Sequence, residues 1–206
     1  MQTKKAFIRE QILRVAKQEF KEKGFQKTSM RDIAKKVNAT TGSIYSYFKN
    51  KDDLFYTIIK PAILAIENDK NLDDHSNNIF DYDQDKIALM ENDIQNMFSH
   101  FVKHFKDELF LLHFRSEGSE YEKYIDDYVN IKASQFTRRI EEKQQEGIFK
   151  KGEVDPYFLR LPVLLALSII QELLLNSMTD EDIEDLEKKA IPLYIKAWEC
   201  VFAIYK

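Results

Sequence analysis

The chain has 206 residues, enough to bury a core in one or two domains, and its 5 glycines and 4 prolines are too few for a turn-rich all-β or collagen-like protein. Its single cysteine, Cys200, excludes an intramolecular disulfide framework and a cysteine-rich metal site, and it fits a reducing cytoplasm. The formal net charge of −4, from 31 basic and 35 acidic side chains, argues mildly against nucleic acid as a partner.

Helical periodicity dominates from the first residues onward and predicts an all-α protein. The first helix should end at Gly24, because glycine adopts a left-handed backbone cheaply. A second, short helix should begin at Ser29, which forms a capping box with Asp32, and end at Asn38. The apolar face of the first helix comprises Ile8, Ile12, Val15, Ala16 and Phe20.

Two further helices follow closely. Thr40 or Thr41 can cap a third helix over 42–48, and a fourth is expected over 51–67, with Pro61 kinking or shortening it. The stretch 67–86 is rich in asparagine and aspartate and poor in aliphatic residues, so it predicts a polar loop.

The second half of the chain also predicts helices, over 87–105, 108–115 and 119–146. Asp155-Pro156 is a strong start signal for a helix over 156–177, whose uncharged run 161–171 is too short to cross a bilayer. A capping box of Thr179 and Asp182 should start the last helix, 180–205, and Pro192 should bend it.

The charge is unevenly distributed along the chain. Residues 1–50 carry 12 basic and 4 acidic side chains, a net charge of +8, whereas residues 51–206 carry 19 and 31, a net charge of −12. Such asymmetry indicates a nucleic-acid-binding end, which reverses the argument from the total. The mixed polar start also leads us to expect no signal peptide and a cytoplasmic protein.

Within the basic part, the second and third helices and their short turn form a helix-turn-helix pattern. The polar start of the third helix suits entry into a major groove, and the apolar Ile44 and Phe48 suit its anchoring. Tyr45 and Tyr47 could donate to phosphate or stack at a base edge, although Tyr45 could also be a core residue. A salt-sensitive attraction to DNA would come from Lys27, Arg31, Lys35, Lys36, Lys49 and Lys51, unless these form an ordinary solvated face.

The same segment resembles the tetracycline-repressor (TetR) family of bacterial transcriptional regulators over about residues 5–56. Asn38 departs from the family's usual glycine, but asparagine tolerates the same backbone. The matching residues are Ile12, Ala16, Phe20, Gly24, Phe25, Thr28, Ile33, Ala34, Val37, Gly42, Ser43, Ile44, Tyr45, Tyr47, Phe48, Lys51, Leu54 and Phe55.

The resemblance implies a three-helix DNA-binding domain over 1–50, followed by a larger helical effector-binding and dimerisation domain over 51–206, with 51–67 as the connecting helix. It also implies a homodimer that binds a double-stranded operator and responds to an unknown small molecule. The expected DNA-binding residues are Thr28, Ser29, Arg31, Thr40, Thr41, Gly42, Ser43, Tyr45, Tyr47, Lys49 and Lys51.

The last two helices are more apolar than one helix pair can bury, which favours a two-fold four-helix interface over the core of a large monomer. The predicted interface comprises Leu164, Leu167, Ile170, Leu174, Tyr194, Trp198, Val201 and Phe202. Aromatic residues in the middle of the chain could line a pocket for a largely apolar effector or form plain core. The pocket candidates are Phe98, Phe101, His104, Phe105, Phe114 and Tyr128.

Other functions have less support. His100 and His104 lie one turn apart and could bind a divalent metal, but the H-E-x-x-H pattern is absent, so we expect no metal or cofactor. The sequence contains no phosphate-binding glycine loop or nucleophile elbow, which argues against an enzyme. The alternative to a regulator is a helical small-molecule or lipid-binding protein whose basic N-terminus binds a membrane or another protein.

Overall fold

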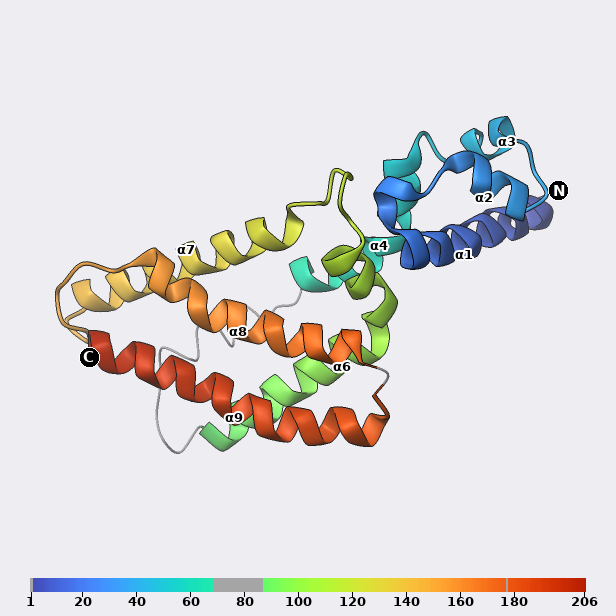
Figure 1. Cartoon of the computed structure of the whole chain (residues 1–206). Coiled ribbons are helices and arrows are strands. Elements are labelled where there is room, and N and C mark those ends of the chain that lie inside the picture. The colour runs from blue at the N-terminus through green and yellow to red at the C-terminus, as the bar shows by residue number, and fades with distance from the viewer. Residues whose placement is uncertain (1, 69–86, 177) are drawn as a thin grey trace. The chain divides into compact units, whose positions relative to one another are not determined.

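The computed structural model describes residues 2–68, 87–176 and 178–206, and every regular element within these ranges is a helix (Figure 1). The chain divides into two compact units. The first comprises residues 1–65 and 105–124, and the second comprises 66–104 and 125–206. The predicted all-α class is confirmed. The first unit takes in residues far beyond position 50, so a functional boundary at that residue stays a prediction.

The first unit contains α1 (Gln2–Lys27), α2 (Met30–Lys36), α3 (Thr41–Tyr45) and most of α4 (Lys51–Asn68). Gly24 interrupts α1 with φ 77° and ψ 166°, and Asn38 ends the α2 region with φ 52°. Both residues therefore adopt the positive φ expected of them. The third helix begins one residue earlier and ends three residues earlier than predicted, and Ser46 serves as its C-cap.

An aromatic cluster holds these helices together. The ring centre of Phe20 lies 5.0 Å from that of Phe55 and 5.8 Å from that of Phe25. The ring centres of Phe25 and Phe55 are 5.2 Å apart. All three are buried, as are Ile12, Ile33, Ile44 and Phe48. Burial of such a side chain contributes roughly 1.5–3 kcal/mol. The apolar residues that the helical period selects are thus the core of the unit.

The first unit also includes the second half of α6 (Ile87–Phe114), which breaks at Phe105 with φ −128°. The break agrees with the two helices predicted over 87–105 and 108–115. Beyond it, Glu108 and Asp107 pair with Lys17 and Lys21 of α1 at 2.8 and 2.6 Å. The Arg115 carbonyl accepts the Phe25 N–H at 2.8 Å. This half of α6 is therefore fastened to α1 by charge and backbone contacts.

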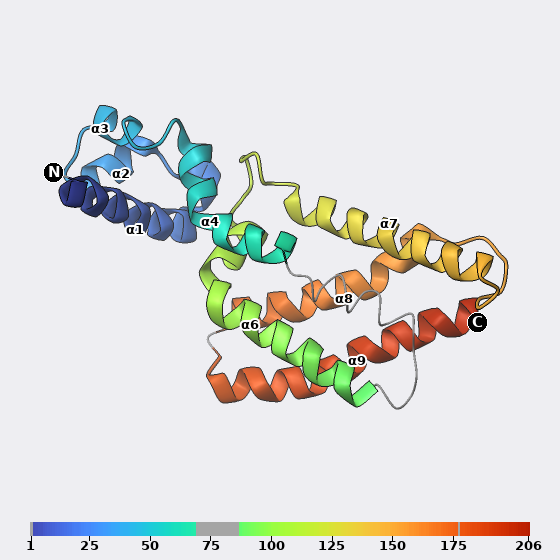
Figure 2. The ribbon, with the colours of Figure 1, turned by 180° about the vertical axis from the view of Figure 1, so that it is seen from behind.

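The second unit combines the first half of α6 with α7 (Tyr124–Gln145), α8 (Pro156–Leu175) and α9 (Asp180–Tyr205). α8 and α9 run side by side in both views (Figures 1 and 2). Asp155 caps α8, and Thr179 forms the predicted reciprocal capping box with Asp182. α7 begins five residues later than expected, after a turn at residues 117–123.

The core of the second unit draws on all four helices. The centre of the Trp198 ring of α9 lies 4.3 Å from the ring centre of Phe136 of α7 and 5.7 Å from that of Phe202. Leu159, Val163, Leu167 and Leu173 of α8 are buried in the same cluster. Each of the four helices therefore buries one apolar face inside the unit.

Two expectations from the sequence need correction. Pro61 does not shorten α4, which runs from Lys51 to Asn68, and α9 likewise continues past Pro192 over its predicted length. A kink at Pro61 and a bend at Pro192 stay predictions; both prolines are exposed. α8 is also long and apolar enough by length and composition to cross a membrane, although the sequence argument had excluded this; such a helix is equally typical of a protein core. Apart from residues 67 and 68, which end α4, the predicted loop 67–86 lies outside the described residues.

Candidate nucleic-acid interface

The candidate site is the turn between α2 and α3 together with the exposed face of α3. Thr40 caps α3, because its hydroxyl oxygen accepts the Ser43 N–H at 3.1 Å. Ser29 likewise accepts the Asp32 N–H at 3.1 Å and caps α2. The Ser29 cap differs from the predicted box, since the Asp32 carboxylate accepts from the Ser29 hydroxyl rather than from its backbone N–H.

The two sides of α3 differ in the way that a recognition helix requires. Ile44 and Phe48 are buried and anchor it to the unit. On the other side, Thr40, Gly42 and Ser46 are exposed, and half of the Tyr45 surface is accessible. Tyr45 is therefore no core residue, whereas Phe48 is. Thr41, Ser43 and Tyr47 are partly exposed, so their polar groups remain within reach of a ligand.

The α4 start fixes the residues that follow the recognition helix. The Asn50 side chain accepts the Asp53 N–H at 2.7 Å, and the Asp53 carboxylate accepts the Lys49 N–H at 2.8 Å. This reciprocal cap holds the backbone at Lys49, whose side chain is exposed. The sequence analysis did not identify this cap, although Asn50 and Asp53 have the spacing of one.

Two of the predicted phosphate ligands are held inside the fold. The Lys51 ammonium donates to the carbonyls of Phe25 and Thr28 at 2.8 and 3.0 Å and lies 4.1 Å from the Phe25 ring centre. Burial lowers the pKa of this ammonium. Thr28 is buried, and its hydroxyl donates to the Gly24 carbonyl at 2.8 Å. Both residues close the turn between α1 and α2, and their contact with phosphate stays a prediction.

The positive charge near α3 is smaller than the residue count indicates. Glu19 of α1 is fully buried, and its two carboxylate oxygens pair with Lys23, at 2.6 Å, and with Lys36 of α2. Although burial of Glu19 acts to raise its pKa, the two lysines hold that pKa below its ordinary value. Arg31, Lys35 and Lys49 are exposed, and Lys35 has only a long contact of 4.0 Å with Asp32. These three are the better placed of the predicted basic residues.

The predicted pocket residues fall into both units. Phe98, Phe101, His104 and Tyr128 belong to the second unit, and Phe105 and Phe114 belong to the first. Phe98 is buried against Tyr194, with ring centres 6.3 Å apart, whereas His104 is exposed. The rings of His100 and His104 lie 4.6 Å apart, but the described residues contain no group of three or more metal-binding side chains.

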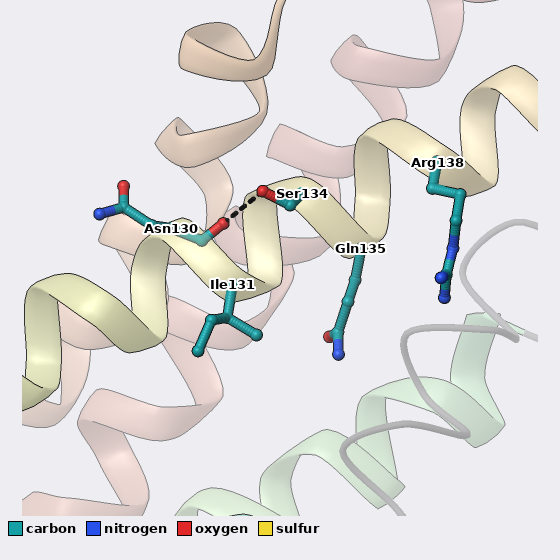
Figure 3. A pocket seen from close by; sticks show the side chains of 5 residues that line it. All are labelled: Asn130, Ile131, Ser134, Gln135 and Arg138. Carbon is teal, nitrogen blue, oxygen red and sulfur yellow. Dashed lines mark hydrogen bonds between the residues drawn. The ribbon is translucent and has the colours of Figure 1, made fainter.

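A surface hollow of about 480 Å³ lies on α7, and none of the predicted pocket residues lines it (Figure 3). Its described lining comes from a single helix: Asn130, Ile131, Ser134, Gln135 and Arg138. The Ser134 hydroxyl donates to the Asn130 carbonyl, a hydrogen bond within the helix (Figure 3). No motif in the sequence singled out these residues.

The predicted dimer residues also separate into two groups. Five are buried in the chain's own core, and such side chains add little area to a contact with a second copy: Leu167, Leu174, Trp198, Val201 and Phe202. Ile170 and Tyr194 are partly buried, and Leu164 is 40% exposed. Leu164 belongs to a stripe that also includes Tyr157, Leu161 and Leu175, all exposed and all on one face of α8.

The N-terminal part of the chain is similar to known regulatory proteins. Residues 12–57 match the model of the bacterial regulatory proteins of the tetR family. The AcrR transcriptional regulator of Shigella flexneri is 46% identical over 50 residues, which are 24% of this chain and 23% of that protein. The matched segment spans about a quarter of the length of the curated relatives, all of which are named as helix-turn-helix transcriptional regulators.

Solved structures resemble the chain over nearly its whole length. NalD, the secondary repressor of the MexAB-OprM multidrug efflux pump in Pseudomonas aeruginosa, has a TM-score of 0.57 at 18% identity over 94% of this chain and 96% of its own. FadR of Bacillus subtilis, solved in complex with stearoyl-CoA, has a TM-score of 0.51 at 22% identity over 91% and 97%. At these identities the likeness establishes the fold alone. The N-terminal segment 12–57 therefore resembles the helix-turn-helix part of the bacterial regulatory proteins of the tetR family, within a chain whose fold is similar to that of these solved structures.

Proposed function

We propose that this chain is a ligand-responsive, homodimeric transcriptional regulator: a repressor that a small, largely apolar molecule releases from a palindromic operator. The observation that carries the proposal is that α3 exposes a polar face while Ile44 and Phe48 on its other side are buried, within the segment that matches the family model. Such a regulator acts where bacterial DNA is, in the cytoplasm.

DNA recognition would divide between two sets of residues. The exposed Thr40, Gly42 and Tyr45 are placed to approach base edges, and Tyr47 is placed to approach the backbone or a base. Arg31, Lys35 and Lys49 are the exposed basic residues around them, and they would supply attraction that depends on salt and not on sequence. Ser29 and the other caps would hold the backbone N–H groups in place for phosphates.

A second copy of the chain would cover the exposed apolar face of α8. Tyr157, Leu161, Leu164 and Leu175 recur at intervals of four, three and eleven residues, which places them within about 60° of one another around the helix. On α9, Leu193, Cys200 and Ile204 are exposed with a similar periodicity. Large apolar side chains gathered on one exposed face are unfavourable in water, and a two-fold contact buries them on both chains at once. Two copies would also present two α3 helices to two half-sites.

Two of the solved structures support an apolar effector. NalD is a repressor of a multidrug efflux pump, and FadR was solved with stearoyl-CoA. In this chain an effector would act by binding more tightly to a state in which the two α3 helices are wrongly spaced for DNA. Equal affinity for both states would shift nothing, so the size of the response measures the difference in affinity.

Binding of the purified protein to labelled duplexes from the region around its own gene tests the DNA-binding proposal. We expect one fragment to bind preferentially, and we expect Tyr47→Ala and Tyr45→Ala to weaken that binding at least tenfold. Ile131→Ala is the matched control, since it removes an exposed large side chain from α7. If no fragment is preferred over random DNA, the regulator proposal fails, and a carrier protein with a basic end becomes the better explanation.

Sedimentation equilibrium tests the dimer separately. Leu161→Glu combined with Leu164→Glu places two charges on the exposed face of α8 and should yield a folded monomer. Ile131→Glu is a control that adds charge to an exposed apolar position elsewhere. A dimer that persists in the double variant would mean that another surface joins the two copies.

A further inference from the structure

We propose that the first turns of α1 form a second DNA-binding surface beside the recognition helix, in which Lys5 and Arg9 bind phosphates of the operator backbone. The inference rests on the proposed function, and it adds residues that lie before the segment matched by the family model, which begins at residue 12. It concerns the sequence-independent part of DNA binding.

The position of these two side chains follows from their contacts with the end of the recognition segment. The Lys5 ammonium lies 5.8 Å from the centre of the Tyr47 ring. The Arg9 guanidinium lies 5.3 Å from the centre of the Phe48 ring, which is itself buried. Lys5 and Arg9 are four residues apart and therefore lie on one face of α1. That face is the one directed at Tyr47 and Phe48.

These aromatic contacts orient the cations without neutralising them. A cation over a ring gains roughly 0.5–1 kcal/mol at an exposed site and keeps its full charge. An arginine held flat on a ring still presents its guanidinium edge, the group that binds phosphate in two-point fashion. Both Lys5 and Arg9 are exposed on their other sides.

Ion pairs occupy the cations in the second half of α1. Lys17 and Lys21 pair with Asp107 and Glu108, and Lys23 pairs with Glu19. In the part of the chain that the structure describes, Lys5 and Arg9 form no such ion pair, and the first turn of α1 contains no acidic residue. Both cations are therefore available to an external anion, and their contacts with Tyr47 and Phe48 hold them beside the recognition helix.

The occupant that fits this surface is the DNA backbone. Tyr47 is a proposed contact of the operator, and Lys5 is within 6 Å of its ring, so a strand that reaches Tyr47 passes the first turns of α1. Neutralising a phosphate releases a condensed counterion, and the logarithm of the binding constant then falls by about 0.9 per contact for each unit of log salt concentration. Two contacts from each subunit, four in the proposed homodimer, contribute about 3.6 to that slope.

The test measures binding over a series of NaCl concentrations, on the preferred fragment and on a random duplex of equal length. Lys5→Gln combined with Arg9→Gln removes four contacts from the homodimer and should lower the slope by about 3.6 on both duplexes, leaving the ratio of their affinities unchanged. The control, Lys150→Gln combined with Lys151→Gln, removes two exposed charges from the second unit and should leave the slope unchanged.

Two further variants separate charge from packing, since Arg9 covers the buried Phe48. Lys5→Gln alone touches no buried ring and should lower the slope by about 1.8, since it removes one contact from each subunit. Arg9→Lys retains the charge and should keep the slope of the unaltered protein. Thermal unfolding of each variant confirms that it is folded.

The outcomes distinguish this inference from the proposed function. An unchanged slope in the folded double variant overturns the inference, even if one fragment is preferred. If no fragment is preferred but the slope on random DNA falls by about 3.6 in the double variant, the inference stands and the regulator proposal fails. A protein that binds neither duplex overturns both.

Discussion

Replacing Gly24 by alanine should destabilise the first unit through the backbone alone. Gly24 has φ 77° and ψ 166°, a conformation that is essentially restricted to glycine. An added Cβ would lie 3.8 Å from Cδ of Arg115, which is an ordinary van der Waals contact. Because the space is sufficient, the cost is the strain of the backbone, about 1–3 kcal/mol.

That strain cannot be relieved cheaply, because the next residue is held in place. The Phe25 N–H donates to the Arg115 carbonyl at 2.8 Å, and the Phe25 ring packs against Phe20 and Phe55 in the core. For a chain of this length, 1 kcal/mol corresponds to a change of roughly 2–4 °C in the melting temperature. We therefore expect Gly24→Ala to lower the melting temperature by about 2–12 °C.

Differential scanning calorimetry of Gly24→Ala beside Gly152→Ala measures this effect. Gly152 has no positive φ, and an added Cβ there meets nothing within 4 Å. Its replacement should be neutral or stabilise by up to about 1 kcal/mol, since alanine restricts the unfolded chain. Equal melting temperatures for the two variants would show that Gly24 is not strained, and the argument from its backbone angles would be refuted.

Three further predictions concern buried ionisable groups. Burial lowers the pKa of His113 from 6.5 to about 4, so the unfolded chain takes up a proton at a higher pH than the folded protein. Between pH 7 and pH 4, the unaltered protein should therefore lose roughly 3 kcal/mol of stability relative to His113→Gln, as measured by urea unfolding. If the two proteins lose stability in parallel, the prediction is contradicted. Burial raises the pKa of Glu187, so Glu187→Gln should melt higher than the unaltered protein at pH 7 and match it below pH 4.5, as calorimetry across pH can check. Glu19→Gln should have a lower melting temperature than the unaltered protein at pH 7, because the ion pairs with Lys23 and Lys36 depress the pKa of Glu19 in the folded state. The ion pairs stabilise the fold only while Glu19 is ionised, so the difference in melting temperature should disappear in strong acid. A difference that persists there undiminished would refute the argument from the ion pairs.

Helix ends were largely predictable from the sequence, because their chemistry is local. Gly24 and Asn38 adopt the expected positive φ, and Thr40 and Thr179 cap the helices that follow them. Each of these acts through a backbone group no more than four residues away. Whether a proline ends a helix was not predictable in the same way, since α4 continues past Pro61 and the cost of the lost backbone hydrogen bond depends on the surroundings of the freed carbonyl in the folded chain.

The candidate site was predictable as a segment and less so as a set of contacts. The resemblance over residues 5–56 correctly located the helix-turn-helix, and the family model matches 12–57. Counting basic residues could not reveal that Glu19 pairs with Lys23 and Lys36, or that Lys51 turns toward the carbonyls of Phe25 and Thr28. A count registers charges, whereas the field at a surface depends on which of them are paired.

The apolar periodicity of α8 and α9 shows the same division between local and tertiary information. The spacing of apolar residues correctly predicted two helices with more apolar surface than a single helix–helix contact can cover. It could not decide which of their side chains face the chain's own core. In the structure, Trp198 and Phe202 are buried in that core, whereas Leu161 and Tyr157 are exposed. The rotation of each helix is settled by packing against α6 and α7, and the interface proposed above uses the residues that this packing leaves exposed.

The sequence by itself determined the helical class, the helix caps, the uneven charge and the helix-turn-helix of this protein, because each depends on residues within a few turns of one another. Only the tertiary structure decided that residues 105–124 join the first unit, through pairs such as Lys17 and Glu108, which lie 91 positions apart. It also decided that Lys5 and Arg9 face Tyr47 and Phe48. Such contacts depend on the close approach of distant segments, and no local rule of helix formation specifies which segments meet.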